Sequence, residues 1–206
     1  MARANFQRNG FQFYSPKGGG GLPQPMPKAV ADNYGTALYV GDPVALVSDG
    51  TIARAAAGSG TAIYGVISAI LQFKNADGVL VRNGKYIPAN TRWTAHEDRT
   101  MVQVILASSS FFAVDADDGS TITTLAGAMD VEGENCDHIF ATADAGLGLS
   151  GALLDISTNN TTDSLQWRIQ AKLAQVGNDF TVTHGRYIVS CNVVQDGNVA
   201  SSATGI

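Results

Sequence analysis

The stretch that most constrains the fold is residues 36–70, the longest uninterrupted β-type pattern in the chain. Two β-type runs flank Asp49-Gly50, a strong hairpin signal because both residues tolerate a positive φ. A further run follows at residues 63–67, where Gly65 predicts a bulge or the close approach of another backbone. The stretch contains no histidine or cysteine, so we expect it to start a sheet and to carry no chemistry.

The rest of the chain favours the same class of structure. Charged residues make up 15% of the 206 residues, there are 23 glycines, and long amphipathic helical patterns are missing. This composition predicts an all-β fold, mainly an antiparallel β-barrel or sandwich, in a chain long enough for one domain with a real core. The expected core residues are Val44, Leu46, Ile52, Val66, Val104, Leu106, Leu165, Trp167, Ile169, Val189 and Val193.

The clearest single strand is residues 165–173, where apolar and polar residues alternate strictly. Such alternation is typical of an antiparallel sheet with one face in the core and the other in water. We therefore expect Trp167 and its apolar neighbours to face inward. The residues expected to face water are Gln166, Arg168, Gln170 and Lys172.

The first 35 residues read differently from the remainder. Four glycines at 18–21 predict a joint, and prolines at 23, 25 and 27 favour an extended, polyproline-like run. We predict an extended N-terminal arm over residues 1–35 and a β-rich domain over 36–206, with a flexible C-terminal tail from about residue 196.

The arm carries the candidate interface. Its aromatic side chains would each gain roughly 1.5–3 kcal/mol on full burial, so they are expected to dock on a surface. That surface is either the domain of the same chain or a neighbouring molecule, and the sequence leaves both open. The candidate capsid or subunit interface residues are Arg3, Phe6, Arg8, Phe11, Phe13 and Tyr14.

Charge is unevenly distributed. Residues 1–28 hold four basic residues and no acid, which leaves 9 basic against 18 acidic residues, a net charge of −9, in the remainder. Residues 100–167 contain ten acidic residues and no lysine or arginine. An acidic body repels nucleic acid and anionic lipid, whereas a basic arm is attracted to an acidic protein surface. No apolar run is long enough to span a bilayer, and the N-terminus lacks the apolar region of a signal peptide.

Four short motifs contain residue types that bind metals or act in catalysis, but none has the spacing that such a site requires. Residues 96–98, His-Glu-Asp, lack HExxH spacing and read as a solvated turn. Residues 115–119 carry acids at the wrong spacing for a calcium loop, and residues 148–151 lack the final glycine of a nucleophile elbow. Cys136 and His138 would share a strand face without a third group to orient the histidine.

The two cysteines, Cys136 and Cys191, lack CxxC spacing and read as free thiols. The sequence therefore predicts a protein that is not an enzyme, with no catalytic residue, no cofactor and no metal site.

Several segments taken in order resemble a known family. They are Asn9-Gly10-Phe11, YVGDPV at 39–44, IYGVI at 63–67, YIPANT at 86–91, GLSGA at 148–152, LDIS at 154–157, LQWRI at 165–169 and a last strand through Gln195. This order is similar to that of tailed-bacteriophage capsid decoration, or cement, proteins and related head structural proteins. The resemblance covers nearly the whole chain, and its specificity comes from the order of the segments, because each one alone occurs widely in β proteins.

The resemblance implies a virion structural protein that is made in the host cytoplasm and sits on the outer capsid surface. Its implied partner is the major capsid protein, whose subunits it would bridge, and a homo-oligomer is implied, with a trimer favoured. The alternative is a head-fibre or receptor-binding β module that uses residues 115–151 to contact a host glycan. In the decoration reading, deleting residues 1–28 is expected to leave the domain folded and to abolish attachment.

Overall fold

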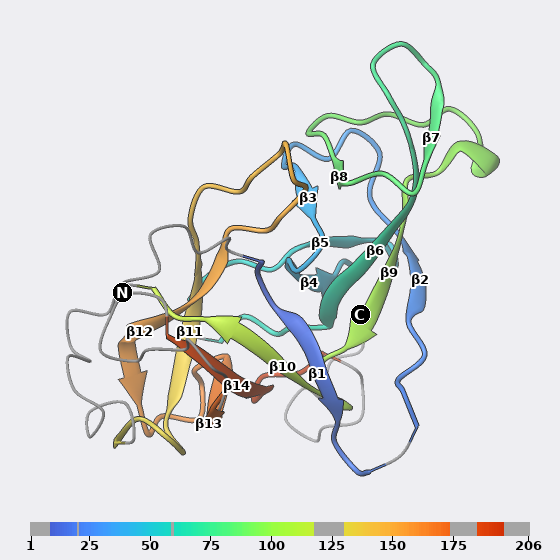
Figure 1. The fold of residues 1–206 in the computed structure, drawn as a ribbon. Helices are drawn as coiled ribbons and strands as arrows, with labels where there is room; N and C mark the ends of the chain where they lie inside the picture. The colour runs from blue at the N-terminus through green and yellow to red at the C-terminus, as the bar shows by residue number, and fades with distance from the viewer. Residues whose placement is uncertain (1–8, 20, 59, 118–129, 174–184, 196–206) are drawn as a thin grey trace.

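The computed structural model describes residues 9–19, 21–58, 60–117, 130–173 and 185–195, and among these the assigned elements are β-strands and one 3₁₀ helix, η1 (His96–Asp98). Two six-stranded antiparallel sheets and one two-stranded sheet make up the fold (Figure 1). The prediction of a mainly antiparallel all-β protein is therefore confirmed.

The first sheet has the strand order β1-β10-β14-β13-β11-β12. It therefore places a strand from near the N-terminus on one edge, next to strands from the middle and end of the chain. The bounds are β1 (Gln12–Pro16), β10 (Ser110–Asp115), β14 (Arg186–Cys191), β13 (Trp167–Lys172), β11 (Asn135–Phe140) and β12 (Ala152–Asn160).

The second sheet has the order β2-β9-β6-β4-β5, with β7 paired to the far end of β6. Its strands are β2 (Met26–Ala29), β9 (Met101–Leu106), β6 (Gly65–Lys74), β4 (Pro43–Leu46), β5 (Ile52–Arg54) and β7 (Leu80–Arg82). The β6–β7 hairpin projects from the body at the upper right of Figure 1, near the small sheet of β3 (Leu38–Tyr39) and β8 (Tyr86–Ile87).

The second sheet curls strongly without closing. A single isolated bridge joins Val30, which follows β2, to Ile52 of β5 on the opposite edge. The strands do not form a closed barrel, so of the two predicted architectures the sandwich-like one describes the molecule.

Two apolar clusters form the core. The larger one lies on the inner face of the first sheet around Trp167 and also includes Val66 and Ile105 of the second sheet, so it joins the two sheets. The smaller one fills the curl of the second sheet around Val44 and Ile67. Of the predicted core residues, those that are buried are Val44, Ile52, Val66, Val104, Leu165, Trp167, Ile169 and Val189. Leu46, Leu106 and Val193 are half-buried.

Gly65 shows why the sequence needs a glycine inside β6. A Cβ at this position would lie 2.3 Å from the backbone oxygen of Ile105 on β9 and 2.5 Å from a methyl carbon of Val104. The close approach of a second backbone, expected from the sequence, is therefore confirmed.

Candidate interaction surface along the N-terminal segment

The segment that begins at residue 9 runs along both sheets of its own chain. β1 pairs with β10 at one edge of the first sheet, and β2 pairs with β9 at one edge of the second. Backbone hydrogen bonds continue each pairing, from Lys17 N to Ser109 O at 2.8 Å and from Val30 N to Thr100 O at 2.9 Å. The described part of the predicted arm therefore supplies strands to the domain that it precedes.

Phe11 is anchored in the core by an unusually close backbone contact. Its N–H donates to the carbonyl of Gly41 at 3.0 Å. A Cβ at Gly10 would lie 2.7 Å from that same carbonyl oxygen, and one at Gly41 would lie 2.5 Å from the carbonyl oxygen of Asn9. Both glycines also have φ in the left-handed region, at +62° and +94°. The Asn9-Gly10 turn and the Gly41-Asp42 turn therefore pack backbone to backbone.

A buried carboxyl fixes this contact from the other side. Ser150 Oγ donates to Asp42 Oδ1 at 2.5 Å, and the backbone N–H of Tyr39 donates to Asp42 Oδ2 at 2.9 Å. Asp42 is 1% exposed, and loss of hydration raises its pKa to about 6 although both hydrogen bonds oppose the rise. Ser150 also accepts from the N–H of Ala152, which ties β12 to the same turn.

Beneath Phe11 lies a second buried polar group, His138 of β11. Trp167 Nε1–H donates to His138 Nδ1 at 3.3 Å, so the ring proton sits on Nε2 and donates to the carbonyl of Ala55 at 3.4 Å. Burial lowers the pKa of His138 to about 4. Both ring nitrogens are engaged and Ser150 bonds Asp42 instead, so these three residues do not form a nucleophile–base relay.

Gln166 corrects one prediction made from the alternation of β13. It was expected in water, but it is fully buried. Its Nε2 donates to the carbonyls of Ala56 at 2.9 Å and Thr61 at 3.2 Å, because the loop after β5 folds over the end of β13. Arg168 and Gln170 are exposed, as predicted.

β1 and β2, each at one edge of a six-stranded sheet, are protected against further pairing. Backbone N–H groups alternate sides along a strand, and that of Val30 faces β9. The backbone nitrogens of residues 25 and 27 therefore face outward, and because both residues are proline they offer no hydrogen-bond donor to another strand. On β1 the register shifts between Phe13 and Ser15, so Tyr14 occupies a bulge. Missing donors and bulges are two ways in which natural proteins prevent edge-to-edge association.

The same segment carries exposed apolar side chains. Five large apolar side chains are exposed among the described residues, and three of them lie between residues 14 and 26. They are Tyr14 (49% exposed), Leu22 (82%) and Met26 (43%). Tyr14 lies in β1, Leu22 in the connection that follows and Met26 in β2, so the three are neighbours along the chain, and we call this set of residues the N-terminal apolar patch.

The predicted interface residues therefore have different fates. Arg3, Phe6 and Arg8 lie outside the described residues. Phe11 is 2% exposed in the core, and Phe13 is half-buried against that core. Tyr14 is exposed. Leu22 and Met26 are not among the predicted interface residues, because that prediction rests on aromatic and basic side chains, although their glycine- and proline-rich surroundings are a signal of exposure.

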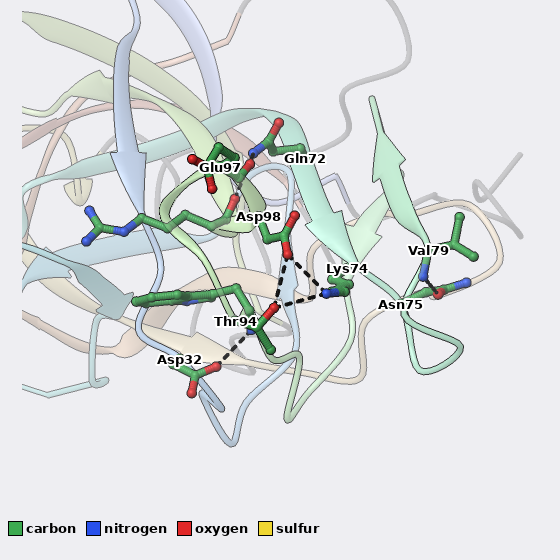
Figure 2. Close-up of polar contacts among 10 residues, drawn as sticks. Asp32, Gln72, Lys74, Asn75, Val79, Thr94, Glu97 and Asp98 are labelled. Carbon is green, nitrogen blue, oxygen red and sulfur yellow. Dashed lines mark hydrogen bonds and ion pairs between the residues drawn. The ribbon is translucent and has the colours of Figure 1, made fainter.

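The His96-Glu97-Asp98 motif lies in η1, and its backbone and Asp98 hold the projecting hairpin (Figure 2). Lys74 Nζ lies 3.0 Å from Asp98 Oδ2, and Thr94 Oγ1 donates to the same oxygen at 3.2 Å. The hydrogen bond from Lys74 is the main reason that the pKa of Asp98 lies below its ordinary value. Gln72 Nε2 donates to the carbonyls of Glu97 and Arg99, so this cluster clamps β6 to the 94–99 loop.

Other candidate groups have structural surroundings. Cys136 and Cys191 are buried free cysteines, and burial raises the pKa of the Cys136 thiol well above its ordinary value, which disfavours a nucleophilic thiolate. Asp117 accepts from the N–H of Ile156. Within the described ranges, no three His, Cys, Asp or Glu side chains are grouped to hold a metal ion, and no helix is long and apolar enough to cross a membrane.

Comparison with protein-family models found no match, and comparisons with curated protein sequences and with solved structures found none either.

Proposed function

We propose that this protein is a non-enzymatic virion structural protein that binds the outer surface of a bacteriophage capsid. It bridges neighbouring major capsid subunits and so stabilises the shell. The ordered segments that resemble tailed-phage decoration proteins motivate the proposal, and the observation that carries it is the N-terminal apolar patch, since Tyr14, Leu22 and Met26 all follow one short basic segment.

The physical case rests on a rigid body that carries a contact surface. Antiparallel sheets joined by one large core resist deformation, and the bulge in β1 and the prolines at β2 disfavour pairing of copies through these two edge strands. The apolar patch offers buriable area, and residues 1–28 add four basic and no acidic residues to attract an acidic partner. Many copies of a modest contact, arranged by the symmetry of a shell, together resist outward pressure. A homo-oligomer, with a trimer favoured, fits such a symmetric arrangement.

The test is attachment to shells of the encoding phage prepared without this protein. Occupancy is measured by quantitative gel densitometry after sedimentation, at several salt concentrations. The structure rules out deleting residues 1–28 as a clean test, because that deletion removes β1, most of β2 and the core residue Phe11. The better variants are a deletion of residues 1–8 and the triple substitution Tyr14→Ser, Leu22→Ser and Met26→Ser.

The matched control is Val79→Ser with Leu147→Ser, which removes the other two large apolar side chains that are exposed in the described part of the chain. Wild type and control should saturate the shells at a fixed stoichiometry, whereas the triple variant should lose at least tenfold in affinity. The 1–8 deletion should lose affinity most at low salt, where its two arginines act. Failure of the wild-type protein to bind shells would overturn the proposal. Saturable binding to host cells instead would favour the head-fibre or receptor-binding alternative.

A further inference from the structure

A cleft of about 620 Å³ opens at one end of the first sheet, away from the N-terminal apolar patch in sequence. Its walls come from the start of β11, the 161–164 turn between β12 and β13, and residues 192–194 after β14. This volume lies within the range of roughly 300–1,000 Å³ that is typical of small-molecule sites. The side chains that carry the argument are Asn135, Asp163, Arg168 and Asn192.

Asn135 presents an acceptor that the described part of the chain leaves unused. The residue is only 8% exposed, and its Nδ2 donates to the carbonyl of Thr162 at 2.9 Å and more weakly to that of Thr161 at 3.5 Å. These two carbonyls fix which way the amide points, because only the NH₂ group can donate to them. Its Oδ1 then has no hydrogen-bond partner among the described residues. A buried acceptor without a partner is costly, so it marks a position where a donor is missing.

Asn192, on a neighbouring wall, also has an unused acceptor, although its Oδ1 is accessible to solvent. Its Nδ2 donates to the carbonyl of Leu165 at 3.2 Å, and its Oδ1 makes no hydrogen bond within the described residues. The cleft is therefore lined by two side-chain amides whose NH₂ groups donate to backbone carbonyls and whose oxygens accept no hydrogen bond from the described residues.

Two opposite charges share the cleft without pairing. Asp163 and Arg168 are exposed, and no ion pair or hydrogen bond of either side chain is found within the described ranges. The carboxylate adds a third acceptor site, and the guanidinium supplies the donors. In the register of the first sheet Arg168 lies directly opposite Asn135, so the donor and one acceptor come from adjacent strands.

We propose that this cleft binds a neutral, hydroxyl-rich ligand, namely a saccharide unit. Asp163 would repel an anionic ligand and Arg168 would repel a cationic one, so the cleft favours neither an anion nor a cation. A sugar ring offers vicinal hydroxyls that donate to the two amide oxygens and the carboxylate and also accept from the guanidinium. The site is independent of the N-terminal apolar patch and adds a binding activity to the proposed capsid role.

Among the described residues, the lining contains no aromatic side chain on which a sugar ring could stack, so a single site is expected to bind in the millimolar range. Many copies on one particle would raise the effective affinity without any new contact. The cleft therefore suits weak, multivalent adhesion to a glycan-covered surface.

The experiment uses the full chain with glucose, galactose, mannose and N-acetylglucosamine as probes, measured by saturation-transfer-difference NMR and titration of amide shifts. The test variant is Asp163→Ala with Arg168→Ala, both exposed. The control variant, Asp77→Ala with Arg82→Ala, removes one exposed charge of each sign from the β6–β7 hairpin instead. Both double variants keep the net charge of the wild type.

At least one sugar should bind wild type and control alike, with at least tenfold weaker binding to the Asp163/Arg168 variant. No binding of any of the four sugars, or equal binding to both variants, overturns the proposal. Tighter binding of inorganic phosphate or of free lysine than of every sugar also overturns it. Attachment to shells should be unchanged in the Asp163/Arg168 variant, so failure here is distinguishable from failure of the capsid role.

Discussion

Phe11 stacks on Trp167, with ring centroids 4.3 Å apart and an interplanar angle of 28°. One ring comes from the segment before β1 and the other from β13, so this contact joins the first described residues to a strand in the C-terminal part of the chain. Phe112 lies edge-on to the same indole at 6.0 Å, and both phenylalanines are buried. The N-terminal segment is therefore part of the core.

The first prediction follows from this contact. Phe11→Ala should lower the free energy of unfolding by about 3–5 kcal/mol, the usual cost of removing a buried phenyl group. Urea denaturation followed by tryptophan fluorescence measures the loss. The control is Tyr14→Ala, three residues along the same segment but exposed, which should change stability by about 0.5 kcal/mol or less. A loss below about 1 kcal/mol for Phe11→Ala would mean that this segment is not an integral part of the core.

The second prediction concerns pH, because two buried groups give slopes of opposite sign. Asp42 has a pKa of about 6 in the folded protein against an ordinary value of 3.8. Its contribution to the free energy of unfolding is therefore largest below pH 4 and is lost as the pH rises through 6. His138 has a folded pKa of about 4 against 6.5, so its contribution grows as the pH rises over the same window. Each effect is on the order of 3 kcal/mol, and they oppose each other.

Removing either group should leave the pH dependence of the free energy of unfolding that is due to the other. In Asp42→Asn the free energy of unfolding should rise more steeply between pH 4 and 6 than in wild type. In His138→Gln it should fall over that range, whatever the overall loss of stability. Denaturant titrations at half-unit pH intervals check this, and equal slopes in both variants would contradict the burial assigned to these groups.

The third prediction tests the close approach of β6 and β9. Gly65→Ala should destabilise the protein by roughly 1–3 kcal/mol, because the new Cβ meets the backbone of Ile105 and the strands must separate. Gly21→Ala is the matched control, since nothing lies within 4 Å of a Cβ built there. Thermal unfolding compares the two variants, and the expected ranking fails if both shift the midpoint equally.

The sequence predicted the elements whose signals are local. The Asp49-Gly50 turn does join β4 to β5, with Leu46 opposite Ile52. Alternation placed Trp167 and Ile169 in the core. These features depend on neighbouring residues alone, so pattern and turn chemistry suffice to find them.

The features that the sequence did not reveal depend on distant partners. No local pattern predicts β11, because its Asn, Cys, Asp and His side chains are buried by hydrogen bonds and packing from other strands. The prolines at 25 and 27 were interpreted as a polyproline-like run, but they border and occupy an edge strand, a role set by the outward direction of their missing donors. The N-terminal apolar patch likewise depends on the positions of β1 and β2, which the sequence pattern does not give.

Gln166 supports the last prediction, because it shows how tertiary context overrides alternation. Its amide connects the loop after β5 with strand β11. The amide NH₂ donates to the carbonyls of Ala56 and Thr61, and Oε1 lies 3.4 Å from the backbone nitrogen of His138. A carboxylate in the same place cannot donate to either carbonyl and would be an uncompensated buried charge. Gln166→Glu should therefore cost roughly 3–5 kcal/mol at neutral pH.

The matched control is Gln170→Glu, four residues along the chain within β13, where the side chain is exposed and, among the described residues, bonds only Ser190. That variant should change stability by about 0.5 kcal/mol or less. Because a buried carboxyl is easier to accommodate when protonated, the deficit of Gln166→Glu should shrink as the pH falls from 7 to 4, whereas that of Gln170→Glu should not. Denaturant titrations at both pH values compare the pair, and a deficit that stays constant with pH would show that the side chain at 166 reaches water.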